Sequence, residues 1–399
     1  MSSHARVQEI DFLAPPAVQS WQQRALVIGI AFGIASLIGA AMQPAQAMHS
    51  FLLAYMFWIG FTLGSMAMLM VWHLTGGDWG VGIRRILEAA TGTLPLMAVL
   101  FLVILLGLRF NYAWARPDFV HDEHTQNLTS HYLNFRDVLI RGLVYFAGWW
   151  VLMHFLLRWS DEQDRPEERP LGMRFRALSG LGLAFYGWSM TFASIDWVMS
   201  LEAPWPSSIF ALVLMVSEGM CGICLCVIVG RALQRWQPMQ SLLRPHNFQD
   251  HGKLLLMFVM LWGWFSYSQW LIIWAGNLPE EIKWFAGRIH GDWGTVALIL
   301  IVGHFAIPFA LLLSRGLKRD GGALAWVAGW LLLMAYLDAF WYIAPAFHRD
   351  SFYFSWLDAV EPIALGGLWL AYFFRNLKSR PLAALHDPQL RALLEKEHE

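Results

Sequence analysis

Apolar runs separated by short polar breaks recur along almost the whole sequence. A helix needs about 20 predominantly apolar residues to cross the hydrocarbon core of a bilayer, and most of these runs approach that length. The pattern therefore predicts an all-α polytopic membrane protein with about ten transmembrane helices. We expect these spans near residues 24–42, 48–72, 91–108, 136–158, 174–200, 207–231, 252–276, 292–315, 322–346 and 357–376.

The distribution of Lys and Arg orients these spans. Basic residues concentrate in the N-terminal segment, the even-numbered loops and the C-terminal tail, whereas the odd-numbered loops hold few. Because short loops rich in Lys and Arg stay in the cytoplasm, both termini are predicted to be cytoplasmic. The predicted organisation is an N-terminal segment (1–23), spans one to four (24–158), a cytoplasmic linker (159–173), spans five to ten (174–376) and a C-terminal tail (377–399).

Composition agrees with a membrane location and excludes other classes. The chain is 57% hydrophobic and only 14% charged, whereas soluble domains carry about 25% charged residues. The net charge of −1 gives no reason to expect nucleic acid as a partner. The polar segment 1–23, with Pro15-Pro16, lacks the layout of a cleavable signal peptide.

Three cysteines lie together in the sixth span. Cys221, Cys224 and Cys226 lack the second pair that would complete a metal site, and no Cys-x-x-Cys-His motif for covalent haem is present. We interpret them as small buried core residues and predict no metal site.

A polar loop after the second span has helical periodicity of its own. Residues 73–92 contain glycines followed by apolar residues such as Ile83 and Ile86, with Arg84 and Arg85 among them. The pattern suits an interfacial helix whose arginines point towards lipid phosphates.

Titratable side chains are spread through the depth of the spans. A charged group at the bilayer centre costs about 2.5–3.5 kcal/mol on insertion scales, so such groups tend to face a protein interior and mark function. Glu218 and His304 fall near the midplane of their spans, and Tyr267 and Ser268 can bridge gaps between carboxylates. Further groups lie towards the outer side (Asp196, Asp338 and Glu361) or the cytoplasm (His154, Glu88, His73 and Asp78). This series predicts a route along which protons hop between titratable groups and water.

Each of these residues also has a structural interpretation. His304 could fix helix packing by donating to a backbone carbonyl, and Asp196 and Asp338 could be protonated or cap helix ends. Glu218 is the hardest to explain in this way, because apolar residues flank it in mid-span. Asp137 and Arg141 have the i,i+4 spacing of an ion pair at the membrane edge.

Three stretches resemble one known family. SIDWVMSLEAPWPSSIFAL (194–212), HGKLLLMFVMLWGWFSYSQWLIIWAGNLPEEIKWF (251–285) and HLTGGDWGVGIRRILEAATGTLP (73–95) are similar to the ActF subunits of bacterial alternative complex III. That complex is a quinol:cytochrome c (or other electron acceptor) oxidoreductase, and ActF is related to NrfD and polysulfide-reductase membrane anchors. The chain departs from the family's Glu-Pro-His-Trp pattern, because it has Glu202-Ala203-Pro204-Trp205 there.

The resemblance implies a fold, a function and partners. The ten helices would form two four-helix bundles, spans two to five and six to nine, in a bacterial inner membrane. The chain would hold no haem or iron–sulfur cluster of its own, and a quinol such as menaquinol is a candidate ligand. Its partners would be haem c subunits, an iron–sulfur subunit, a sister NrfD-like subunit and lipid. The family's transmembrane proton route agrees with the series of titratable groups.

Two other functions stay open from the sequence. The chain could itself bind quinol near the outer face, with Asp196 beside Trp197, or His290 beside Trp293, as base and aromatic wall. It could also be a secondary transporter, although no matched pair of broken helices emerges in its two halves.

Overall fold

Every regular element in the computed structural model is a helix, within the residues that it describes: 12–116, 131–165, 171–203, 205–349, 351–384, 387 and 389–390. The first half contains α2 (Pro16–Met42), α3 (Pro44–Thr75), α4 (Asp78–Val81), α5 (Arg84–Thr91), α6 (Leu94–Leu106), α7 (Leu108–Asn111), η1 (Ala113–Ala115), α9 (Phe135–Gln163), α10 (Gly172–Trp197) and η2 (Met199–Glu202). The second half contains α11 (Phe210–Leu233), α12 (Met239–Leu242), α13 (Pro245–Gly276), α14 (Pro279–Ile289), α15 (Gly291–Leu300), η3 (Ile301–Ala306), α16 (Ile307–Leu313), α17 (Arg315–Arg319), α18 (Gly321–Ile343), η4 (Ala344–Ala346) and α19 (Trp356–Lys378).

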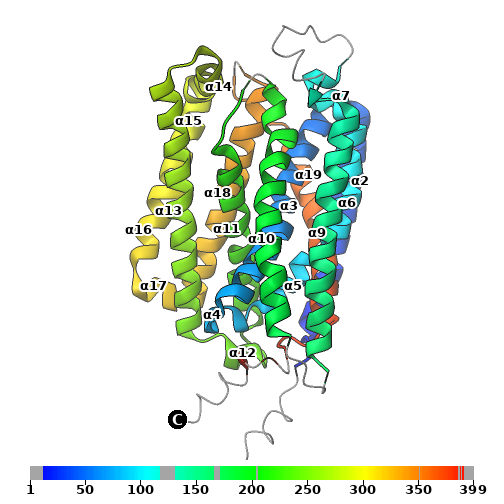
Figure 1. Ribbon diagram of the computed structural model, residues 1–399, viewed down its shortest axis with the longest axis vertical. Coiled ribbons are helices and arrows are strands. Elements are labelled where there is room, and N and C mark those ends of the chain that lie inside the picture. The colour runs from blue at the N-terminus through cyan, green and yellow to red at the C-terminus, as the bar shows by residue number, and fades with distance from the viewer. Residues whose placement is uncertain are drawn as a thin grey trace, which may run out of the picture.

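The prediction of a polytopic all-α membrane protein is confirmed. Nine helical segments of the described chain are long and apolar enough to cross a bilayer. The remaining predicted span corresponds to α10, a helix of 26 residues whose Gly, Ser, Tyr and Trp residues make it less apolar than the others. It runs alongside the other long helices (Figure 1).

Several helices extend beyond the predicted limits. α2 begins at Pro16, inside the segment predicted to precede the first span, and α9 continues to Gln163, into the predicted linker. Pro44, Pro245 and Pro279 likewise occupy the first turn of their helices. Proline is favoured at this position because its fixed φ suits the helix and its missing N–H has no intrahelical partner there. Apolar run length therefore underestimates these helices.

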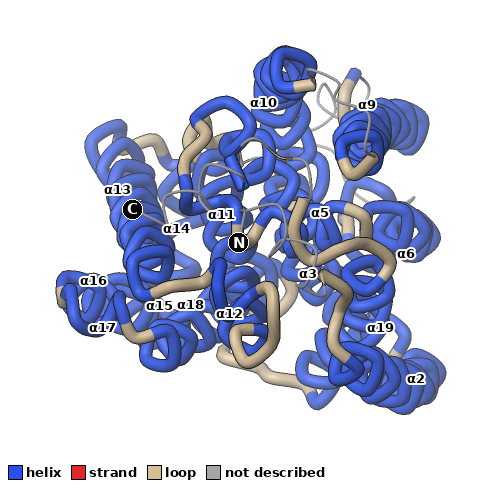
Figure 2. Tube along the Cα trace, turned by 90° about the horizontal axis from the view of Figure 1, so that it is seen from below, coloured by secondary structure: helices blue, strands red, loops and turns tan. Residues whose placement is uncertain are grey.

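The long helices pack as two four-helix groups. In the first, α3 contacts α6 and α10, and α9 contacts the same two helices; in the second, α11 contacts α13 and α18, which both contact the α15–η3–α16 segment. The two groups meet where α3 packs against α11, and α2 and α19 pair on the flank beside α3 (Figure 2). This is the predicted arrangement of spans two to five and six to nine. We name the two ends of the assembly after the helices found there, the α14 end and the α12 end (Figure 1).

Glycine makes the contact between the two bundles close. A Cβ atom added at Gly64 of α3 would collide with the backbone of Glu218 in α11, and one at Gly222 of α11 would lie 3.0 Å from the backbone nitrogen of Ser65. Without side chains at these points the helix backbones approach directly, as small residues allow in membrane bundles.

Adding one methyl group at this contact tests its importance. We expect Gly64→Ala to destabilise the protein by about 1–3 kcal/mol, because the interface is already filled by backbone. Gly33→Ala on α2 is the matched control, since a Cβ there meets no atom within 4 Å. This substitution should not destabilise the protein, because alanine loses less conformational entropy than glycine on forming a helix. Thermal unfolding of the detergent-solubilised variants measures both effects. Equal melting temperatures for the two variants would contradict the proposed close contact.

Candidate functional site

Glu218 points into the protein interior where three helices meet. It lies about two turns inside the start of α11, and it is buried, with Gly60 of α3 placed so that an added Cβ would lie 3.4 Å from its Cγ. Tyr186 of α10 donates a hydrogen bond to Glu218 Oε2. The carboxyl group therefore has Tyr186 as its hydrogen-bond donor among the described residues and contacts both bundles.

A small cavity connects Glu218 with Asp338 of α18. Both carboxyl groups line a space of about 40 Å³, together with Gly60, Ser217 and Tyr342. A polar cavity larger than about 10–15 Å³ can hold a water molecule. The two carboxyl groups, 120 positions apart in sequence, thus share a space in which water can join them.

Asp338 has one satisfied and one unsatisfied oxygen. Trp262 of α13 donates its indole N–H to Asp338 Oδ2 at 2.9 Å, whereas Oδ1 has no hydrogen-bond partner among the described residues. Leaving a buried acceptor unsatisfied costs about 1–3 kcal/mol. Water in the cavity would satisfy this oxygen.

His304 extends the same cluster. Its ring stacks on Trp262 with centroids 4.2 Å apart, and it is fully buried on the π-helical turn η3. Neither ring nitrogen has a hydrogen-bond partner within the described parts of the chain. Single π-helical turns are frequent at functional sites. His304 thus lies beside the carboxyl pair, although the intervening Trp262 cannot relay a proton.

A second, larger hollow is also lined by Asp338. Its volume is about 750 Å³, and its walls are mostly aromatic and apolar, including Trp262, Trp264, Trp270 and Trp341. Tyr267, predicted as a bridge between carboxylates, lines this hollow and is exposed. Asp338 is therefore reached from a wide apolar space as well as from the small cavity.

Asp196 occupies a different environment, in the first bundle. Arg141 of α9 binds it through two contacts, Nε to Oδ2 at 2.9 Å and Nη2 to Oδ1 at 2.7 Å, and the Tyr145 hydroxyl donates to Oδ2 at 2.9 Å. The predicted pairing of Arg141 with Asp137 is wrong, because Asp137 instead exchanges hydrogen bonds with Asn134 at the N-terminus of α9. Sequence spacing favoured the near carboxylate, but helix packing places the far one opposite the guanidinium group.

The other residues of the predicted proton route are dispersed. Glu361 is buried on α19 and accepts a hydrogen bond from Ser36 of α2 at 2.6 Å. His154 is exposed on α9 and stacks on Trp150. Ser268 is half-buried on α13. None of these three lines the cavity shared by Glu218 and Asp338.

The residues of the two predicted quinol sites lie in different surroundings, some buried and one exposed. Trp197 is buried in an aromatic cluster with Tyr55, Phe101 and Trp149, next to the ion-paired Asp196. His290 is exposed at the end of α14. Trp293 is buried and donates to the backbone carbonyl of His348 at 2.9 Å.

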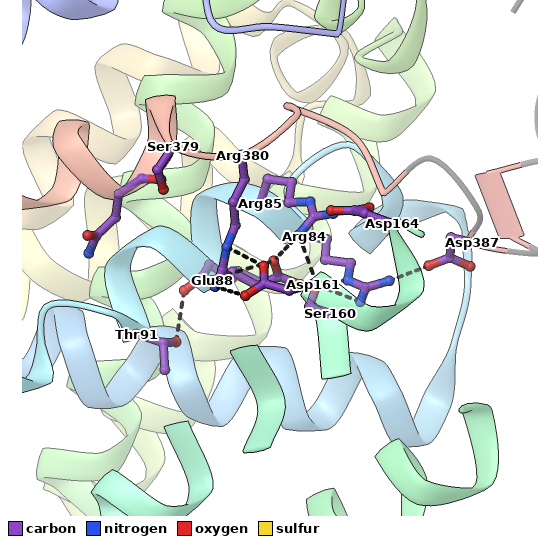
Figure 3. A network of polar contacts seen from close by, with 12 residues as sticks. Arg84, Arg85, Glu88, Thr91, Ser160, Asp161, Asp164, Ser379, Arg380 and Asp387 are labelled. Atoms are coloured by element: carbon purple, nitrogen blue, oxygen red, sulfur yellow. Dashed lines mark hydrogen bonds and ion pairs between the residues drawn. The ribbon is translucent and has the colours of Figure 1, made fainter. Parts of the chain in front are cut away.

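The predicted interfacial helix is wrong in its orientation, because its arginines are buried. α5 continues towards α6 as part of one span, and Arg84 and Arg85 are both almost fully buried. Both bind Glu88 at 2.7 Å, and they also contact Asp387 and Asp164 respectively (Figure 3). The four carboxylates around these arginines and Arg380 come from α5, the end of α9 and the C-terminal tail: Glu88, Asp161, Asp164 and Asp387. Carboxylates of the protein thus take the place predicted for lipid phosphates.

His73 and Asp78, predicted on the cytoplasmic side, and the three cysteines are the remaining residues considered in the sequence. His73 stacks on Phe175 of α10 with centroids 4.2 Å apart, and Asp78 begins α4. The three cysteines are buried, which confirms their interpretation as core residues, and Cys221 also lines the small cavity. The described residues contain no group of three or more His, Cys, Asp or Glu that could hold a metal ion.

An ion pair also fixes α14 over its end of the assembly. Arg288 of α14 contacts Glu202 at 2.7 Å, and Arg349 contacts the same carboxylate. Burial lowers the pKa of Arg288 to about 10, against the opposing attraction of Glu202. The guanidinium group is therefore still charged at neutral pH. Glu202, in the segment that connects α10 with α11, thus has an ion-pair partner on another helix.

A double-mutant cycle tests whether Asp196 and Arg141 stabilise the protein as an ion pair. Removing either partner of a buried ion pair costs about 3–5 kcal/mol, whereas replacing both by apolar residues is often close to neutral. We expect Arg141→Met and Asp196→Leu each to lower the melting temperature, and the double variant to regain most of the loss. If the double variant is as unstable as the sum of the single variants, the two residues do not act as a pair.

The residues that line the cavity shared by Glu218 and Asp338 come from both bundles. Comparison of the chain with models of known protein families and with curated proteins gives no match. The likeness to the ActF family accordingly rests on the three sequence stretches quoted above.

Proposed function

We propose that this chain is an integral membrane subunit of a respiratory quinol:electron-acceptor oxidoreductase of the alternative complex III type, and that it conducts protons through Glu218 and Asp338. The shared cavity is the observation that carries the proposal. In this view the chain lies in a bacterial inner membrane with both termini in the cytoplasm. Haem c, iron–sulfur and sister NrfD-like subunits are its partners, and they hold the redox cofactors.

The chemistry follows from the surroundings of the two carboxyl groups. Glu218 exchanges a proton with water in the cavity while Tyr186 holds its other oxygen in place. The unsatisfied Oδ1 of Asp338 receives the proton from the same water, while Trp262 keeps Oδ2 fixed. Among the described residues neither carboxyl group forms an ion pair, so each can change its protonation state without leaving an arginine unpaired. A proton thereby moves from α11 to α18 within the membrane.

Neutral substitutions at the two carboxyl groups test this route. We expect Glu218→Gln and Asp338→Asn to lower proton translocation by the purified complex in liposomes about a hundredfold, as loss of a proton-transfer group does. Glu361→Gln is the matched control, because Glu361 is also a buried carboxyl group but does not line the cavity. A Glu218→Gln complex with full turnover and full proton translocation would remove Glu218 from the route. Purification without haem-bearing subunits would contradict the assignment to a respiratory complex.

The larger hollow favours a second candidate function, quinol binding by this chain itself. A quinol ring with an isoprenoid tail needs an apolar, aromatic-walled space and a hydrogen-bond acceptor for its hydroxyl group. The hollow of about 750 Å³ supplies both, with Asp338 as the acceptor. At Asp196, in contrast, Arg141 and Tyr145 already bind both carboxylate oxygens.

A quinone analogue distinguishes these two positions. We expect a short-chain ubiquinone or menaquinone analogue to quench tryptophan fluorescence through the indoles that line the hollow, and Asp338→Asn to weaken binding by about 1–3 kcal/mol. Asp196→Asn is the control and should leave affinity unchanged in folded protein. Loss of binding on Asp196→Asn, with Asp338→Asn unaffected, would place the quinol at the first bundle instead.

A further inference from the structure

A third hollow opens at the α14 end, close to the shared cavity. Its volume is about 410 Å³, and we name it the vestibule. Its wall includes Ser207 and Ser208 from the loop before α11, Gln269 of α13 and Glu281 in the first turn of α14. Hydroxyl, amide and carboxyl groups thus line the vestibule. α14 lies at this end of the helical assembly (Figure 1).

A buried amide in the vestibule lacks a partner. Gln269 is only 3% exposed, and its Nε2 has no hydrogen-bond partner in the described portion of the chain. An amide nitrogen donates two hydrogen bonds, and burying it without an acceptor is costly. A hollow of this size has ample room for water molecules, which would supply the missing acceptors.

The same two segments border the vestibule and the cavity shared by Glu218 and Asp338. The end of α10 and the residues after it contribute Ile195 to the wall of the vestibule and Val198 to the wall of the cavity. The start of α11 contributes Ile209 to the vestibule and Leu214 to the cavity. Ile209 and Leu214 are five residues apart, which corresponds to a separation of about 8 Å along α11 at a rise of about 1.5 Å per residue. That separation is short enough for two or three water molecules to bridge.

A pair of aromatic rings occupies the start of this separation. Phe210, the first residue of α11, is fully buried and packs edge-to-face on Tyr342 with centroids 5.1 Å apart. Tyr342 itself lines the cavity beside Asp338. Trp205 packs on Phe210 from the loop and stacks on Trp284 of α14 with centroids 3.9 Å apart. Aromatic contacts thus connect the start of α11 with Tyr342 beside the cavity and, through Trp205, with α14.

We propose that the vestibule is the water-filled mouth of the Glu218–Asp338 cavity, and that the Phe210–Tyr342 ring pair is the gate between them. This inference rests on the proposed proton route. Protons exchange between Asp338 and the aqueous phase at the α14 end when the rings separate and water joins the two spaces. The rings otherwise keep the two spaces apart, which prevents a continuous leak.

Cysteine modification tests the mouth directly. The native cysteines are at most 3% exposed, so Ser208→Cys introduces the one reactive thiol among the described residues. We expect a charged, membrane-impermeant methanethiosulfonate reagent, added from the α14 side, to label this variant and to lower proton flux through the purified complex severalfold. Ser351→Cys is the control: Ser351 is exposed at the same end but lines none of these hollows, so labelling should leave flux unchanged.

The outcomes separate the two proposals. Complete labelling of Ser208→Cys with unchanged flux would overturn the vestibule as the mouth, while the carboxyl route stands. If the complex conducts no protons even before the reagent is added, both the proton route and the role of the vestibule as its mouth are overturned. Phe210→Ala addresses the gate: we expect a severalfold rise in passive proton leak, which Phe135→Ala on the exposed face of α9 should not cause. An unchanged leak in folded Phe210→Ala protein would show that the rings do not form the barrier.

Discussion

The direct backbone contact between α3 and α11 is the constraint on which the rest of the structure depends. Gly60 and Gly64 leave no side chain on the face of α3 that meets Glu218. The close approach of the helices takes Glu218 out of contact with lipid and places it between the two bundles. A carboxyl group in hydrocarbon would be costly, but in this position Tyr186 can donate to it and the cavity can hydrate it. Helix packing thus determines both the burial of the group and its partners.

The buried carboxyl groups of this chain fall into two kinds. Asp196 and Glu88 each face arginine, so their charge is neutralised within the protein. Losing that charge by protonation would leave a buried guanidinium group without its partner, which is strongly unfavourable. Glu218 and Asp338 have neutral donors, Tyr186 and Trp262, and form no ion pair in the described part of the structure. Only the second kind suits repeated loss and gain of a proton.

The sequence predicted well what depends on local pattern. The run length of apolar residues set the approximate number and limits of the spans. Mid-span position identified Glu218 and His304 as unusual, and Asp338 was identified as a carboxyl group in the outer part of its span. It could not predict which side chains meet across helices. Arg141 was paired with Asp137 by spacing, because Asp196 is far from it in sequence. Arg84 and Arg85 were assigned to lipid although Glu88 lies one turn away, because their other partners, Asp387 and Asp164, are distant in sequence. Trp262 and Tyr186 were overlooked for a similar reason, since aromatic residues are abundant and only packing distinguishes these two.

The same reasoning explains why a depth series of titratable groups overestimates a proton route. Depth orders residues along one axis, but a proton moves only between groups joined by hydrogen bonds or water. Glu361 and His154 have suitable depths, yet one is bonded to Ser36 on the flank and the other is exposed on α9. Glu218 and Asp338 satisfy the stricter condition, because one cavity contains both. Trp262 stacks on His304 and donates to Asp338, and His304 itself does not line this cavity. The proposed proton route therefore depends on the hydration of one small space more than on the number of titratable residues in the spans.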